Sequence, residues 1–81
     1  MAFNERAVKD LKHEYIPWFS EGDEPMSWET RDHGDVGSET TGDIDVRAGL
    51  AFCDAVDKQV PGAKARYDSC DEWVFVEVEE I

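Results

Sequence analysis

The sequence is poor in basic residues. It holds 8 lysines and arginines against 20 aspartates and glutamates, which gives a formal net charge of −12 over 81 residues. Proteins that bind nucleic acid over a broad surface neutralise its phosphates with lysine and arginine. The shortage of these residues therefore excludes such a surface, and we expect no direct contact with nucleic acid.

Long apolar runs are also lacking. No segment approaches the roughly 20 apolar residues that a membrane span needs. The chain shows no basic stretch followed by an apolar stretch, which is the pattern of a secretory signal. We therefore expect no membrane partner and a cytoplasmic location, which would be the host cell cytoplasm if a phage encodes the chain.

Residues that bind metals or act in catalysis are few, with two cysteines and two histidines. Cys53 and Cys70 lack the close spacing of a zinc site, and we expect both to be reduced thiols. His13 and His33 are not part of any recognisable set of nucleophile, base and orienting group. The short acidic clusters do not match the twelve-residue calcium loop. The sequence therefore predicts no catalytic residue, no metal and no cofactor.

The composition nevertheless predicts a folded protein. Hydrophobic residues make up 41% of the chain and aromatic residues 11%, whereas disordered chains are poor in aromatic and β-branched residues. A chain of this length is typical of one small domain, and we expect residues 1–81 to form it.

The apolar periodicity predicts two helices. The first covers residues 4–16, with Asn4 as N-cap and Pro17 ending it. The second begins at an Asp43 cap and runs to about residue 60, where Pro61-Gly62 stops it. Its apolar positions cover so wide a stripe that we expect a mostly buried helix.

The segment between the helices predicts less regular structure. Residues 20–25 indicate a polar loop. Residues 26–31 alternate in polarity and predict a strand, with Ser27, Glu29 and Arg31 on its polar side. Residues 36–41 are compatible with either a weak return strand or an extended loop.

The C-terminal segment has the clearest pattern. Residues 63–68 and 73–80 predict a β-hairpin around a loop over 69–72. This loop pairs Tyr67 with Val74, Ala65 with Val76 and Ala63 with Val78 on the core face. The same register places Lys64 opposite Glu77 and Arg66 opposite Phe75 on the other face. The fold class is α+β, with two helices packed on a small antiparallel sheet of three or four strands that ends in this C-terminal β-hairpin.

Acidic residues occur in every segment, and the charge exceeds the magnitude of roughly 2–8 that suits a small domain. Three explanations remain open: a basic partner, a high-salt environment, or solubility alone. Carboxylates at alternate strand positions, such as Glu77 and Glu79, lie about 6.6 Å apart. A nucleic-acid strand carries one phosphate per roughly 3.4 Å of axis. Carboxylates on neighbouring elements could therefore imitate a row of phosphates.

The leading hypothesis is a non-catalytic inhibitor that occupies the basic surface of a nucleic-acid-binding protein or complex. In size and charge alone, the chain resembles the acidic inhibitors that phages and mobile elements use against restriction or CRISPR systems. Immunity proteins and antitoxins share this physics, since an acidic surface steers association while aromatic anchors give affinity. The expected partner-binding residues are Glu21, Asp23, Glu24, Asp32, Asp35, Glu39, Asp71, Glu72, Trp73, Phe75, Glu77 and Glu79.

Three alternatives accompany this hypothesis. The chain could be a salt-adapted structural or interaction domain without mimicry, or an immunity-like or antitoxin-like protein. Trp73 and Phe75 could form a second small core under the N-terminal helix instead of an uncovered anchor. We expect a monomer or a homodimer, and residues 73–76 would support a dimer if they lay at a sheet edge.

Overall fold

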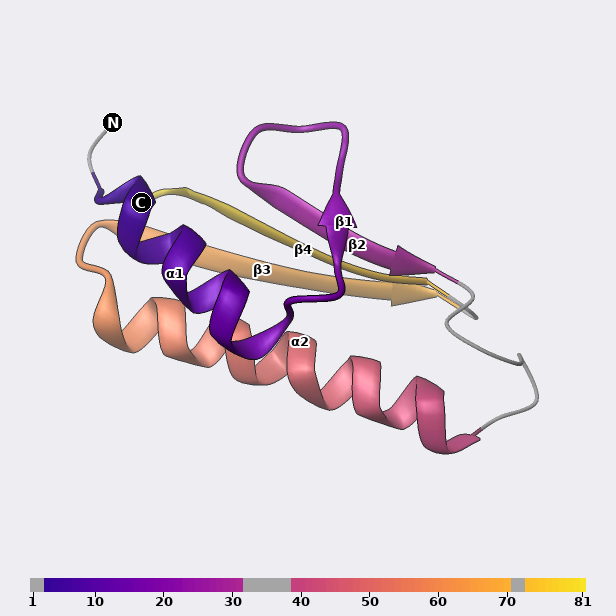
Figure 1. The fold of residues 1–81 in the computed structure, drawn as a ribbon. Coiled ribbons are helices and arrows are strands. Elements are labelled where there is room, and N and C mark those ends of the chain that lie inside the picture. Colours follow the sequence, from indigo (N-terminus) through magenta and orange to yellow (C-terminus); the bar gives the residue numbers. More distant parts are fainter. Residues whose placement is uncertain (1–2, 32–38, 71–72) are drawn as a thin grey trace.

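A computed structural model of the chain describes residues 3–31, 39–70 and 73–81 (Figure 1). Side chains are described for residues 3–30, 44–70 and 73–81. The elements, in chain order, are α1 (Glu5–Tyr15), β1 (Ser20–Glu21), β2 (Ser27–Arg31), α2 (Glu39–Gln59), β3 (Ala63–Cys70) and β4 (Trp73–Glu80). A helix followed by a pair of strands thus occurs twice, and the α+β class is confirmed.

The described strands form one antiparallel sheet in the order β1-β2-β4-β3. The last strand, β4, is paired on both sides, with β2 and with β3. Because β2 and β3 are both antiparallel to β4, they are parallel to each other, and α2 forms the crossover between them (Figure 1). The suggestion that residues 73–76 lie at a sheet edge is therefore wrong, since the described edge strands are β1 and β3.

The first helix is capped as its sequence predicts. The side chain of Asn4 accepts a hydrogen bond from the backbone N–H of Ala7 at 3.1 Å. At the other end, the N–H of Ile16 donates to the carbonyl of Lys12 at 2.9 Å. The buried residues Val8 and Leu11 turn one side of α1 towards the core.

The second helix begins earlier than predicted. It starts at Glu39, so Asp43 lies inside the helix and does not cap it. The strand or loop expected over 36–41 is wrong for its last three residues, which are helical; residues 36–38 lie outside the described part. Thr40, Thr41 and Gly42 are weak helix formers, but propensity is a weak guide that context overrides. Because of these residues, the first turn of α2 could not be predicted from the sequence.

The expectation of a mostly buried α2 is also wrong for part of its apolar set. Phe52 and Val56 are fully buried, whereas Ile44 is 51% exposed and Leu50 is 48% exposed. The helix packs on β3 and β4 and on α1, so residues on its remaining side reach solvent. The helix therefore carries more apolar residues than it buries against the sheet and α1.

The C-terminal hairpin is confirmed, but its register differs from the predicted one by two residues. Tyr67 pairs with Val76, Ala65 with Val78, Ser69 with Val74 and Cys70 with Trp73. The first strand therefore continues to Cys70, whereas the second begins at Trp73 as predicted, and residues 71–72 alone separate them. A shift of two residues leaves every side chain on the same face because the side-chain period of a strand is two. The predicted core face is therefore right although the pairs are not.

The core lies between the sheet and the two helices, which cover the same side of it (Figure 1). Trp28 of β2 meets Phe52 of α2 edge-on, with ring centroids 5.8 Å apart. The loop predicted over residues 20–25 is wrong at its first two positions. Ser20 and Glu21 form β1, an edge strand that pairs with β2.

Candidate partner-binding face

Trp73 and Phe75 lie on the side of the sheet away from the helices. The neighbouring positions Val74, Val76 and Val78 are buried in the core, and successive strand residues point to opposite faces. Trp73 and Phe75 are half-buried and do not belong to the core cluster, which includes residues of α1. The alternative of a second core under the N-terminal helix is therefore wrong. We call this side of the sheet the outer face; its described side chains include Glu29, Lys64, Arg66, Asp68, Trp73, Phe75, Glu77 and Glu79.

The two aromatic side chains form a pair. Their ring centroids are 5.4 Å apart and the planes are inclined by 31°. The indole N–H of Trp73 donates a hydrogen bond to Oε1 of Glu29 at 3.2 Å. Since Glu29 belongs to β2, this bond joins two strands and fixes both side chains on the outer face.

Carboxylates flank this pair on both neighbouring strands. Phe75 is directly opposite Glu29 of β2 and directly opposite Asp68 of β3. Asp68 is exposed, and its Oδ1 accepts the backbone N–H of Ser69 at 2.8 Å. One row across three strands therefore carries carboxylate, aromatic ring and carboxylate. Such a row suits a cation, because both the ring face and the carboxylates attract positive charge.

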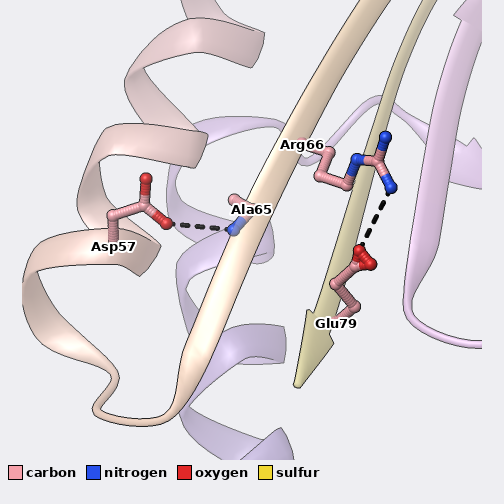
Figure 2. A network of polar contacts seen from close by, with 4 residues as sticks. All are labelled: Asp57, Ala65, Arg66 and Glu79. Atoms are coloured by element: carbon pink, nitrogen blue, oxygen red, sulfur yellow. Dashed lines mark hydrogen bonds and ion pairs between the residues drawn. The ribbon is translucent and has the colours of Figure 1, made fainter. Parts of the chain in front are cut away.

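Further along β4, basic residues offset the acidic ones. Arg66 pairs in register with Glu77, and its Nη1 lies 3.2 Å from Oε1 of Glu79 (Figure 2). Lys64 is opposite Glu79, so the predicted partners of Lys64 and Arg66 are wrong by the same two-residue shift. Because the ion pair is exposed, it adds little stability. At the other end of the outer face, the carboxylates of Glu29 and Asp68 flank Phe75, and Arg31 pairs in register with Trp73.

A second acidic group lies at β1 and in the loop after it. Glu21, Asp23 and Glu24 are exposed, and they line a groove of about 740 Å³ together with Lys9 and Lys12 of α1. Lysine side chains thus share this groove with the carboxylates. It is a surface of mixed charge, lined by Trp28 and not by Trp73 or Phe75 of the outer face.

The β1–β2 loop reaches the outer face at Gly22. A Cβ atom on Gly22 would lie 3.5 Å from Cε2 of Phe75. It would lie 2.5 Å from the hydroxyl of Ser27, which donates to the carbonyl of Glu24 at 2.6 Å. The backbone of this loop therefore packs closely against one side of the aromatic pair.

The structure places the predicted partner-binding residues in two separate groups. Trp73, Phe75, Glu77 and Glu79 share the outer face, whereas Glu21, Asp23 and Glu24 line the groove. Asp32, Asp35, Asp71 and Glu72 lie outside the described residues. Glu39 begins α2, and its side chain is not among those described.

Glu29 and Asp68 were missed by the sequence reasoning. The alternation over 26–31 already placed Glu29 on the polar side of its strand. The missing information was that β2 pairs with β4 in a register that sets Glu29 opposite Phe75. Asp68 is the last residue of the predicted strand 63–68, and only the observed register, shifted by two residues, sets it opposite Phe75.

The two thiols differ in environment. Cys53 is buried, and burial, followed by the nearby charge of Asp57, raises its pKa to about 12. It therefore stays protonated and unreactive near neutral pH. Cys70, at the end of β3, is exposed.

The described part of the chain contains neither a candidate metal cluster nor a candidate membrane span. Within residues 3–31, 39–70 and 73–81, no three His, Cys, Asp or Glu side chains gather as a metal site would require. No helix in these ranges combines the length and hydrophobicity needed to span a membrane. The chain matches no known family, no curated protein sequence and no solved structure.

Proposed function

We propose that this protein is a non-catalytic acidic inhibitor that occupies the basic nucleic-acid-binding surface of a partner protein. The observation that supports this most is the carboxylate–ring–carboxylate row of Asp68, Phe75 and Glu29 beside Trp73. It lies on a sheet face that neither described helix covers. The surface thus offers an aromatic anchor and negative charge in one place.

Aromatic residues supply affinity in such an interface. Binding energy concentrates in a few residues, and tryptophan is among the most frequent of them. Trp73 is half-buried and already ordered by Glu29 and Phe75. Ordering it on binding therefore costs little additional side-chain entropy.

The net charge supplies steering and selectivity. A charge of −12 attracts a basic groove at long range and raises the association rate at low salt. Because the same basic groove attracts both this protein and nucleic acid, the two would compete for it. This is the mode of action of a phosphate mimic, of the anti-restriction or anti-CRISPR kind.

The test is capture from the native host lysate at low salt with the tagged chain. We expect recovery of a basic nucleic-acid-binding protein that is released as salt rises and displaced by added DNA or RNA. Trp73→Ala should reduce the recovery severalfold. Leu50→Ala is the matched control, because it removes an exposed apolar side chain from α2 instead of the outer face.

Two outcomes would contradict the proposal. The first is that a chain shown to be folded at low salt recovers no such partner. The second is that the chain unfolds at low salt and folds near molar salt, where screening weakens its self-repulsion. That behaviour would identify a salt-adapted domain whose acidic surface reflects its solvent.

A further inference from the structure

We propose that the outer face receives an arginine side chain of the partner, whose guanidinium stacks on the Trp73–Phe75 pair and donates hydrogen bonds to Glu29. This inference rests on the proposed function and names the group recognised there. The occupant follows from charge complementarity, because the site combines two aromatic rings with a carboxylate on each adjacent strand. These two carboxylates outnumber Arg31 of β2, which pairs in register with Trp73.

Glu29 can accept hydrogen bonds from such a guanidinium while it keeps its bond to Trp73. One of its oxygens accepts the indole N–H of Trp73, and an ionised carboxylate has about four lone-pair sites in all. Its remaining sites can accept N–H groups from a ligand. Glu29 is half-buried, so water screens its charge less than that of a fully exposed carboxylate. The tryptophan thus both orients the carboxylate and contributes a ring beside it.

The geometry favours arginine over lysine. A guanidinium is planar and weakly hydrated, so it can stack on a ring while its N–H groups bond a carboxylate at the ring edge. An ammonium is a compact, strongly hydrated charge and cannot do both in this way. Asp68, opposite Phe75 on the other side, adds attraction for the same cation.

The experiment uses two probes of equal charge, the peptides Gly-Arg-Gly-Arg-Gly and Gly-Lys-Gly-Lys-Gly, titrated into the folded chain. The indole N–H signals of Trp18, Trp28 and Trp73 are followed by NMR, and Trp73→Phe assigns the Trp73 signal. We expect the arginine peptide to shift the Trp73 signal and leave Trp28, which is buried in the core. Its affinity should exceed that of the lysine peptide by about fivefold or more.

Glu29→Gln is the decisive variant. Glutamine keeps an oxygen that can accept the indole N–H, so the fold and the Trp73 orientation should persist while the charge is lost. We expect this variant to lose the preference for arginine. Glu14→Gln is the matched control, because Glu14 is an exposed glutamate on α1, and it should bind like the parent chain.

Equal binding of the two peptides, a Trp73 signal that does not move, or an unaffected Glu29→Gln variant would each overturn the inference. Its failure is distinguishable from failure of the proposed function. Lysate capture of a basic partner by a chain that ignores the arginine peptide would overturn the inference alone. Arginine binding at Trp73 without any captured partner would support the inference and contradict the proposed function.

Discussion

Asp57 of α2 accepts the backbone N–H of Ala65 in β3 at 2.9 Å (Figure 2). This N–H points away from β4, because alternate residues of an antiparallel edge strand face outward. Two more outward N–H groups of β3 are also bonded, Ala63 to the carbonyl of Val60 and Ser69 to the side chain of Asp68. The helix and neighbouring carboxylates thus protect an edge strand that could otherwise pair with another chain.

Removing the Asp57 carboxylate should expose this edge. We expect Asp57→Ala to lower the free energy of unfolding by about 0.5–1.5 kcal/mol and to increase self-association, as measured by urea denaturation and sedimentation. Asp57→Asn keeps an oxygen acceptor and should retain both properties of the parent chain. Equal self-association of the alanine variant and the parent would show that this contact does not protect the edge.

A second carboxylate joins α2 to the segment between α1 and β1. Asp45 is 5% exposed, and its Oδ1 accepts the indole N–H of Trp18 at 2.8 Å. We expect Asp45→Ala to cost about 1–3 kcal/mol of stability, since it leaves a partly buried donor without this acceptor. Asp45→Asn should cost less because its amide oxygen can still accept. An asparagine variant as unstable as the alanine variant would contradict this role of the hydrogen bond.

Gly22 and Ser27 should show strong coupling. A Cβ at position 22 would lie 2.5 Å from the Ser27 hydroxyl, which is buried and bonded to Glu24. Gly22→Ala should therefore destabilise the parent chain by about 1–3 kcal/mol. In a Ser27→Ala background the same change should cost much less, because the clashing oxygen is gone. A double-mutant cycle by urea denaturation measures this coupling, and additive effects would contradict the close packing of this loop.

The two cysteines should differ in reactivity. We expect maleimide to label Cys70 quickly in the folded chain, and Cys53 only on unfolding, because Cys53 is buried. Equal labelling rates in the folded chain, followed by mass spectrometry, would contradict the described burial.

The raised pKa of Cys53 also predicts an alkaline loss of stability. The pKa is about 12 in the folded chain and 9.0 ordinarily. Above the lower value the unfolded chain binds fewer protons than the folded chain, so stability falls as pH rises from about 9 to about 12. Urea midpoints of the parent and of Cys53→Val measure this effect. The valine variant should lose less stability than the parent chain between about pH 9 and about pH 12. An identical pH dependence of stability in both chains would contradict the raised pKa of Cys53.

Local patterns allowed most of the elements to be predicted. Asn4 and Pro17 bracket α1, and the alternation of residues 73–80 predicts the buried valines of β4. The register of the hairpin could not be obtained from this pattern, since two registers that differ by two residues present the same faces. The start of α2 was hidden because Thr40, Thr41 and Gly42 have weak helix propensity.

The candidate site was predictable in part. Alternation along β4 placed Trp73 and Phe75 together, apart from the valine face. Their neighbours Glu29 and Asp68 depend on strand pairing, and the β2–β4 pairing is between segments far apart in the chain. A short run such as Ser20–Glu21 has no apolar pattern, so β1 forms only because β2 offers it an edge. Such non-local pairing is not encoded in any single segment.

The most direct test of the proposed competition uses the captured partner and a fluorescent nucleic acid bound to it. Adding this chain should release the nucleic acid in proportion to the chain bound, and fluorescence anisotropy measures the release. The Trp73→Ala variant should need a severalfold higher concentration, while Leu50→Ala should match the parent. A ternary complex, in which the chain binds while the nucleic acid stays in place, would contradict the account.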